Sequence, residues 1–108
     1  MSFSVIITQS AQDELRKIYL YIHTTLKAPN AAVRIFNKIE KSVFSLDTDP
    51  LRCRVYDKEP WRSKGFRVMV IEKYLAFYTV DENENTVIIH HIIYGARNID
   101  EILMSDDE

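Results

Sequence analysis

The sequence predicts a small single-domain α+β fold, in which an N-terminal strand and a two-helix hairpin pack on an antiparallel sheet in the order β-α-α-β-β-β-α. Two successive apolar stripes with helical spacing fill the first half of the chain, and three β-rich runs with short turns follow residue 65. The 108 residues suffice for one hydrophobic core but not for two, so we assign residues 1–108 to one domain. Hydrophobic residues make up 46% and charged residues 28%, which favours a globular chain over a disordered one.

The first half predicts a strand followed by two helices. Residues 3–8 are compact and β-branched, as strands are, and Ser10 is expected to cap the next helix with Asp13 and Glu14 in its first turn. The apolar stripe of this helix comprises Ala11, Leu15, Ile18, Ile22 and Leu26. Pro29 and Asn30 begin a second helix, whose expected buried residues are Val33, Phe36, Ile39, Val43 and Leu46. Because the connection is short, the two helices are expected to pack as an antiparallel hairpin.

The second half predicts the sheet. Residues 51–65 lack a clear period and are expected to form a loop with at most a short strand. Strands are expected over residues 66–71, 74–80 and 86–94, joined by turns at 72–73 and 81–85. The third strand is apolar on both faces, which is typical of a central position in the sheet. A short helix over 98–104 and an acidic tail over 105–108 complete the chain.

The charge is unevenly distributed along the chain. The total is −2, but residues 1–99 carry 14 bases and 11 acids, a net charge of +3. A basic segment between residues 52 and 67 combines two acids with six bases: Arg52, Arg54, Lys58, Arg62, Lys64 and Arg67. With Trp61 and Tyr56 nearby, this segment could bind phosphates while stacking bases. Alternatively it is a solvated loop whose charges balance Asp57, Glu59 and the acidic tail.

Several classes of site are excluded or disfavoured. The single cysteine, Cys53, excludes an internal disulfide and a cysteine-based zinc site, and we interpret it as inert. His90 and His91 are adjacent on a predicted strand and are expected on opposite faces, so no metal site is predicted, and no cofactor. No stretch resembles a signal peptide or a membrane span, which predicts a cytoplasmic protein with no membrane partner.

A nuclease function remains open at this point. Cleavage of RNA needs groups that deprotonate a 2′-hydroxyl, stabilise the phosphorane and protonate the leaving oxygen. Suitable side chains are Arg62, Lys64, Arg67, His91, Tyr94 and Arg97, although the sequence does not show that they converge. The competing interpretation places one histidine in the core and one half-exposed, and pairs Arg97 with Asp100 or Glu101.

The order of these elements and several short motifs resemble the RelE/ParE superfamily of toxins from bacterial type II toxin–antitoxin systems. The motifs are Ser10-Ala11-Gln12-Asp13-Glu14-Leu15, Gly65-Phe66-Arg67-Val68, the run from Tyr74 to Asp81, and the strand that ends in Gly95-Ala96-Arg97. The resemblance implies one of two activities: poisoning of DNA gyrase, as by ParE-like toxins, or ribosome-dependent cleavage of mRNA, as by RelE-like toxins.

Two departures favour the ParE-like activity. RelE-like nucleases usually carry an arginine where this chain has Leu75, and a tyrosine or histidine where it has Leu103. They are also strongly basic, as suits a ribosomal RNA surface, and this chain is not. The resemblance further implies a cognate antitoxin, for which we expect contacts at Leu15, Tyr19, Ile22, Arg62, Lys64 and Arg67. DNA gyrase is the expected target, and the ribosome with its mRNA is the alternative.

Overall fold

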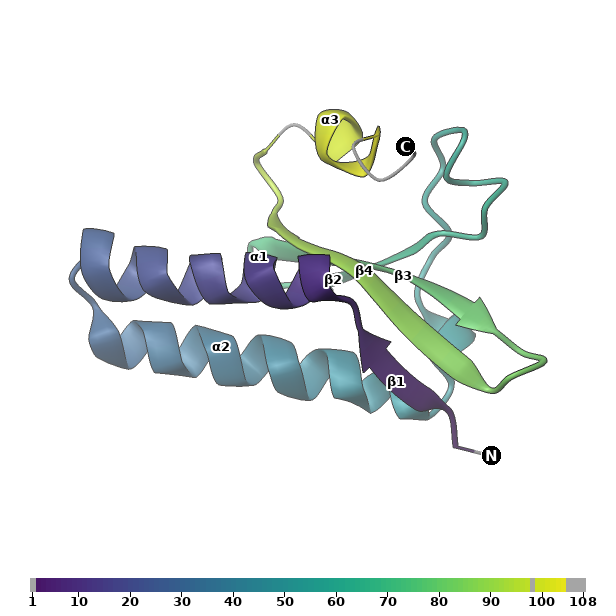
Figure 1. Ribbon diagram of the computed structural model, residues 1–108, viewed down its shortest axis with the longest axis horizontal. Coiled ribbons are helices and arrows are strands. Elements are labelled where there is room, and N and C mark those ends of the chain that lie inside the picture. The colour runs from purple at the N-terminus through teal and green to yellow at the C-terminus, as the bar shows by residue number, and fades with distance from the viewer. Residues whose placement is uncertain (1, 98, 105–108) are drawn as a thin grey trace.

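The computed structural model describes residues 2–97 and 99–104, which form two helices laid along one side of a four-stranded sheet (Figure 1). The elements are β1 (Ser4–Ile7), α1 (Gln9–Leu20), a π-helical turn (Tyr21–Thr25), α2 (Pro29–Phe44), β2 (Arg67–Ile71), β3 (Tyr74–Asp81), β4 (Thr86–Tyr94) and α3 (Ile99–Met104). Short 3₁₀ turns at Ser45–Asp47 and Pro50–Arg52 follow α2. The acidic tail predicted over 105–108 lies outside the described residues.

The sheet has the strand order β1-β4-β3-β2. The predicted central position of the strand over 86–94 is confirmed, because β4 pairs with β1 on one side and β3 on the other. The β2–β3 and β3–β4 pairs are antiparallel as expected. β1 is parallel to β4, so the sheet is mixed rather than wholly antiparallel. A chain that leaves β1 through a helical hairpin returns to the sheet only much later, and this longer route permits a parallel pair.

The helical hairpin covers one face of the sheet and forms the main core with it (Figure 1). The buried residues are Ala11, Leu15, Ile22, Ala32, Ile35, Ile39, Val43, Leu46, Ile71, Ala76, Tyr78, Val87, Ile89 and Ile92. On α2, Ala32 and Ile35 occupy the positions expected for Val33 and Phe36. Val33 is exposed and Phe36 only half-buried, so the predicted buried face was turned by about one residue.

The start of α1 also differs from the prediction. Thr8, not Ser10, is the N-cap, since its Oγ1 accepts a hydrogen bond of 3.2 Å from the backbone N–H of Ala11. The same hydroxyl lies 3.3 Å from the carbonyl oxygen of His90 and donates to it, which ties the helix start to β4. The helix therefore begins at Gln9, and Asp13 and Glu14 fall in its second turn.

A second core lies on the opposite face of the sheet, under α3 and the segment that precedes β2. Its buried residues are Trp61, Phe66, Val68, Phe77, Ile93 and Leu103. Trp61 is only 3% exposed, so it cannot stack on a nucleic-acid base as its place in the basic segment suggested. The backbone of residues 54–56 pairs with the start of β2, which confirms a short extended stretch within the predicted loop. None of the described helices is long and apolar enough to cross a membrane.

The two adjacent histidines lie on the same face of the sheet, which corrects the expectation from strand alternation. A β-bulge makes His90 an extra residue, because Phe77 pairs with His91 whereas Tyr78 pairs with Ile89. His91 therefore shares the side of Phe77, and the His90 ring stacks on Phe66 of the same core, with centroids 4.8 Å apart. One histidine is buried and the other half-buried, as expected. Within the described residues, no group of three or more potential ligands could hold a metal ion.

Candidate functional site

Three bases of the basic segment hold other parts of the chain in place. The Arg67 guanidinium donates to the carbonyl oxygens of Leu51 and Cys53 at 3.1 and 2.7 Å. Arg52 donates to the carbonyl oxygen of Thr48 at 2.6 Å, and so holds the chain that leaves α2. Lys58 forms an ion pair with Asp100, one of the two residues that Arg97 was expected to contact. This ion pair raises the pKa of Lys58 above its ordinary value. The other three bases of the segment, Arg54, Arg62 and Lys64, are exposed.

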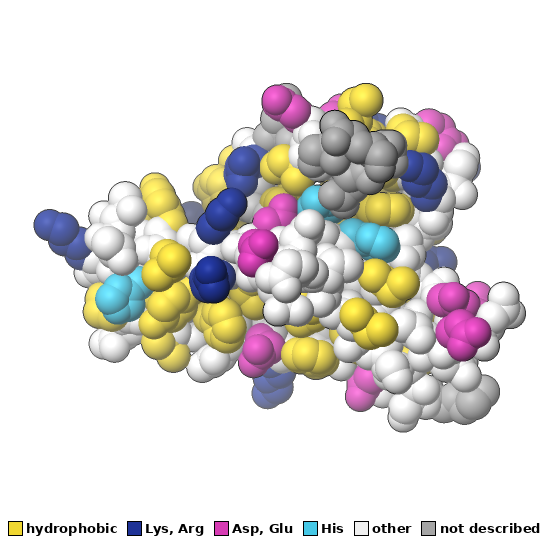
Figure 2. All heavy atoms as spheres, in the orientation of Figure 1, with side chains coloured by type: hydrophobic (Ala, Val, Ile, Leu, Met, Phe, Trp, Pro, Cys, Tyr) yellow, Lys and Arg dark blue, Asp and Glu magenta, His cyan; other side chains and the backbone are white. Residues whose placement is uncertain are grey.

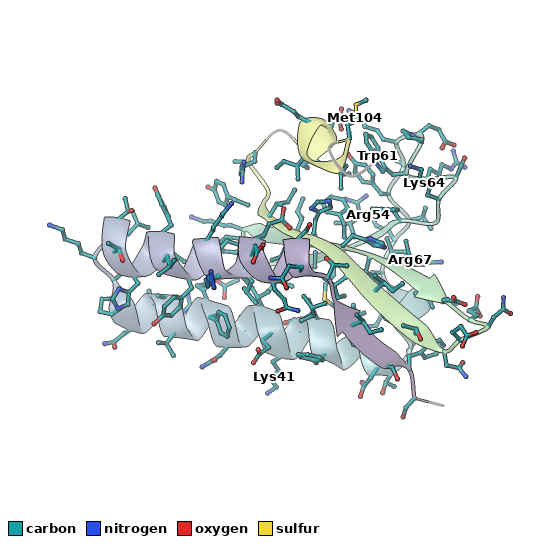
Figure 3. All side chains as sticks on the ribbon, in the orientation of Figure 1. Lys41, Arg54, Trp61, Lys64, Arg67 and Met104 are labelled. Carbon is teal, nitrogen blue, oxygen red and sulfur yellow. The ribbon has the colours of Figure 1, made fainter. Side chains whose placement is uncertain are left out.

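The six candidate nuclease residues occupy separate parts of the fold. Arg67 is opposite Tyr78 on β3, whereas Tyr94 is opposite Tyr74 at the other end of the same strand. Four residues of strand separate these positions by about 13 Å. Arg62 and Lys64 lie on the loop near Arg67, where Figure 3 shows Lys64 and Arg67 at the same end of the molecule. Arg97 follows Tyr94 closely in sequence and lies at the opposite end.

His91, the remaining candidate, is buried and already engaged. Its Nδ1 donates to the Glu14 carboxylate, with a distance of 3.0 Å to Oε2. The other oxygen of Glu14 accepts from the backbone N–H of Ile92 at 3.1 Å. Since β1 ends at Ile7, this carboxylate takes up the N–H that a longer β1 would have bonded. The pair secures α1 to the edge of β4 and leaves the imidazole little access to a substrate.

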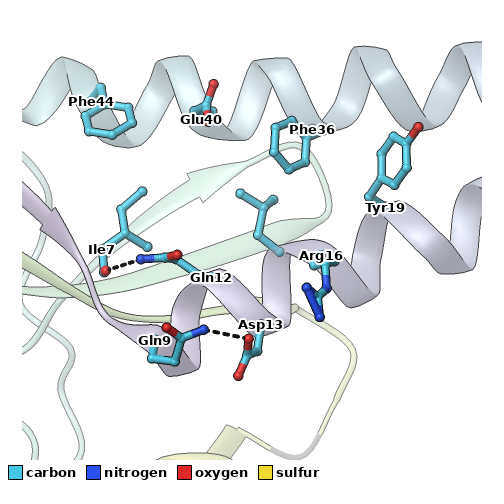
Figure 4. Close-up of a pocket in the computed structure, with 10 residues that line it drawn as sticks. Ile7, Gln9, Gln12, Asp13, Arg16, Tyr19, Phe36, Glu40 and Phe44 are labelled. Atoms are coloured by element: carbon cyan, nitrogen blue, oxygen red, sulfur yellow. Dashed lines mark hydrogen bonds between the residues drawn. The ribbon is translucent and has the colours of Figure 1, made fainter.

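A groove runs between α1 and α2 beside the end of β1 (Figure 4). It has a volume of about 660 Å³ and an apolar lining contributed by Ile7, Leu15, Tyr19, Phe36 and Phe44. Tyr19 and Phe36 meet edge to face, with ring centroids 5.9 Å apart. Arg16 of α1 and Glu40 of α2 add opposite charges to the rim. We call this hollow the α1–α2 groove.

One side of β1 is open next to this groove. The N–H groups of Ser4 and Thr8 bond to carbonyl oxygens of the β4 side, so strand alternation turns the backbone of Val5 and Ile7 away from β4. Gln12 Nε2 donates to the carbonyl oxygen of Ile7 at 2.9 Å, as drawn in Figure 4. A side-chain amide is readily displaced, so the edge can accept an added strand.

A second groove lies between α1, the end of β4 and α3, with a volume of about 590 Å³. Tyr21, Tyr74 and Tyr94 line it, and the rings of Tyr74 and Tyr94 are 5.8 Å apart. Burial raises the pKa of Tyr74 above its ordinary value, with smaller contributions from Tyr94 and Glu72. Lys17 and Arg97 supply positive charge at the rim. We call this hollow the α1–β4 groove.

The residues expected to bind an antitoxin are dispersed. Leu15 and Tyr19 line the α1–α2 groove, whereas Ile22 is buried in the main core. Arg62 and Lys64 lie on the loop that precedes β2, and Arg67 is the first residue of β2. The sequence interpretation missed the contribution of Phe44, Arg16 and Glu40 to the groove. A signal was present, because α2 carries more apolar residues than one buried stripe requires.

Known proteins resemble this chain in both sequence and fold. Residues 5–99 match the family described as ParE toxin of type II toxin–antitoxin system, parDE. A chain of the chromosomal ParDE system from P. aeruginosa is 21% identical, with a TM-score of 0.71 over 86% of this chain and 96% of that one. A chain of the RelBE2 toxin–antitoxin complex from Mycobacterium tuberculosis is 22% identical, with a TM-score of 0.66 over 87% and 99%.

A more distant similarity is to the archaeal RelE–RelB complex from Pyrococcus horikoshii OT3. That chain is 12% identical, with a TM-score of 0.59 over 91% of this chain and 100% of that one. No curated protein sequence matches closely enough to add to these comparisons. At these identities the solved structures establish the shared fold, and the family match rests on the sequence itself.

Proposed function

The chain belongs to the ParE toxin family of type II toxin–antitoxin systems, and we propose that it arrests growth in the cytoplasm by binding DNA gyrase and trapping its cleavage complex. The observation that carries this proposal is the dispersal of the groups a nuclease would need. Arg67 serves two backbone carbonyls, His91 is buried against Glu14, and Arg97 lies at the far end of the sheet. A binding poison needs no assembled acid–base pair, whereas cleavage of RNA does.

The two leucines that depart from the RelE-like pattern support the same proposal. Leu103 is 1% exposed and packs in the second core, and Leu75 packs against that core from β3. Leu75 also lies beside Gly95, where an added Cβ would be 3.6 Å from its Cγ. Reactive side chains at these positions would have to replace packed apolar ones, so the two sites have structural roles here.

Induction of the toxin without its antitoxin tests the proposal against the alternative, a ribosome-dependent endoribonuclease. We expect DNA synthesis, followed by pulse labelling, to fail before RNA or protein synthesis, and covalent gyrase–DNA complexes to accumulate. Failure of protein synthesis first, with cleaved ribosome-bound mRNA, would establish the nuclease instead. Unchanged growth after induction would contradict both.

We further propose that a cognate antitoxin neutralises the toxin by laying an amphipathic helix in the α1–α2 groove and adding a strand along β1. The groove has an apolar lining between α1 and α2, which fits the apolar face of a helix. The open backbone of Val5 and Ile7 offers hydrogen bonds to an extended segment. A segment that folds on binding can cover both surfaces with a short chain.

Phe44→Asp tests this antitoxin surface. Phe44 is 44% exposed, so the substitution leaves the core intact but places a carboxylate in the apolar groove. We expect antitoxin affinity, measured by calorimetry, to fall at least 30-fold, as at an interface residue worth about 2 kcal/mol. Leu51→Asp is the matched control, since Leu51 is 42% exposed and lies outside the groove. Equal effects of the two substitutions would contradict this assignment.

A further inference from the structure

We propose that the α1–β4 groove is the surface that docks the target, and that its occupant is a polypeptide segment of the target carrying both carboxylates and apolar side chains. The inference rests on the proposed function, in which the target is a protein. It assigns to this groove the residues Lys17, Tyr21, Tyr74, Tyr94 and Arg97.

The lining of the groove has the composition of a protein-binding surface. Three tyrosines line the groove together with Ile18 and Ile102, which are partly exposed and form its apolar floor. Tyrosine and arginine are enriched where protein interfaces concentrate their binding energy. A tyrosine also offers a large ring at a low entropic cost, with a hydroxyl that remains able to hydrogen-bond.

The exposed charge in the groove is positive. Glu14 is the carboxylate of the lining, and it is already satisfied by His91 and the N–H of Ile92. Over residues 2–97 and 99–104, neither Lys17 nor Arg97 has an ion-pair partner. Two unpaired cations beside an apolar floor complement a segment that places carboxylates next to apolar side chains.

Nucleic acid fits this groove less well. A surface that follows a phosphate backbone needs a row of cations, because each neutralised phosphate contributes to affinity through counterion release. Here the two cations are set among tyrosines and aliphatic side chains. The remaining exposed bases of the chain include Arg54, Arg62 and Lys64, which belong to the basic segment and not to this groove.

The hairpin tip extends the apolar surface of the groove outward. Tyr21 and Leu26 line the groove and are each 56% exposed, and Leu20 beside them is 50% exposed. These residues surround the π-helical turn, in which the Leu26 N–H bonds to the carbonyl oxygen of Tyr21 at 3.0 Å. Figure 1 shows this end of the hairpin projecting beyond the sheet, and Figure 2 shows hydrophobic side chains on the visible face of the hairpin, mainly along the seam between α1 and α2. Such exposed apolar patches mark interaction sites.

The α1–β4 groove is separate from the α1–α2 groove. Successive residues of an α-helix are turned by about 100°, so the set Gln12, Arg16 and Tyr19 lies on one side of α1. Glu14, Lys17 and Tyr21 lie on nearly the opposite side. The lining residues follow this division, with the first set in the α1–α2 groove and the second in the α1–β4 groove. Substitutions can therefore affect one groove and spare the other.

The test uses the full chain with Lys17→Glu, Arg97→Glu and Tyr94→Ala. Lys41→Glu is the matched control, because Lys41 is exposed on α2 and lines neither groove (Figure 3). Growth arrest after induction, binding to immobilised purified gyrase, and antitoxin affinity are measured for each. We expect the three groove variants to bind gyrase at least tenfold more weakly and to lose growth arrest. Their antitoxin affinity should stay within twofold of the wild type, which also shows that they are folded.

Retention of full growth arrest by both charge-reversal variants would overturn the inference. Binding of wild-type toxin to duplex DNA alone, lost in the same variants, would also overturn it and identify a nucleic-acid occupant. Failure of the proposed function has a different signature: the wild-type toxin arrests growth without binding gyrase or trapping its cleavage complex. If the groove variants then still lose growth arrest but bind antitoxin normally, the groove stands as the docking surface for another target.

Discussion

The substitution Arg67→Ala tests whether Arg67 has a structural or a catalytic role. The guanidinium donates to the carbonyl oxygens of Leu51 and Cys53, and the bond to Cys53, at 2.7 Å, is partly buried. A hydrogen bond to a charged group contributes about 1.5–3 kcal/mol when buried and less when exposed, so we expect the two together to stabilise the fold by about 2 kcal/mol.

This loss has a defined effect on thermal stability. With an unfolding entropy of about 2.1 cal/mol/K per residue, 108 residues give roughly 0.23 kcal/mol/K. A loss of about 2 kcal/mol should then lower the melting temperature by roughly 9 °C. A domain with the usual stability of at least about 5 kcal/mol would remain folded at growth temperature, so growth arrest should persist.

Differential scanning calorimetry of the purified variant measures the first effect. An induction assay at about 30 °C, roughly 15 °C below the melting range of mesophilic domains, measures the second. Arg54→Ala is the matched control, since Arg54 is an exposed arginine of the same segment, and its melting temperature should change little. An Arg67→Ala variant that melts like the wild type but no longer arrests growth would refute this reasoning. That result would give Arg67 a direct role in the toxic activity.

Two further substitutions test the packing and the surface electrostatics. The buried hydroxyl of Tyr78 donates to the carbonyl oxygen of Pro50 at 2.7 Å. Tyr78→Phe should therefore lower the free energy of unfolding, measured in urea, by about 1–3 kcal/mol. An unchanged urea midpoint would contradict this. The ion pairs of Glu72 with Arg34 and Lys38 lower the pKa of its carboxyl in the folded state. Their stabilising effect is therefore present at neutral pH and is lost as the pH falls through that lowered pKa. The stability difference between the wild type and Glu72→Gln should therefore shrink as the pH is lowered below the ordinary pKa of a glutamate. A difference that stays constant with falling pH would contradict the assignment.

The helical hairpin and the three-stranded part of the sheet could be predicted because their patterns are local. Pro29 starts α2, and the alternation and turns between residues 66 and 94 define three neighbouring strands. The parallel pairing of β1 could not be predicted in this way, since it joins residues about 80 positions apart. The same holds for the bulge at His90, which depends on the register between β3 and β4.

The candidate site was harder to predict, because a docking groove and a core present the same side chains in sequence. Phe36 and Phe44 lie on the face of α2 next to the stripe formed by Ile35, Ile39 and Val43. Only the packed hairpin shows which stripe the sheet covers. For Trp61 the error was the reverse: its basic neighbours suggested that it lies on the surface, but it is buried in the second core.

The position of α1 as the wall between the two grooves determines how far an antitoxin must reach to silence the toxin. A helix with its side chains is about 10–12 Å across, and an extended chain covers about 3.3 Å per residue. Because the chain must pass round half the circumference of α1, about 16–19 Å, five or six residues beyond a helix bound in the α1–α2 groove suffice to cross it. These residues would obstruct the α1–β4 groove without depending on Tyr94 or Arg97 for affinity. An antitoxin truncated before those residues would still bind the toxin tightly, yet the bound toxin would remain active.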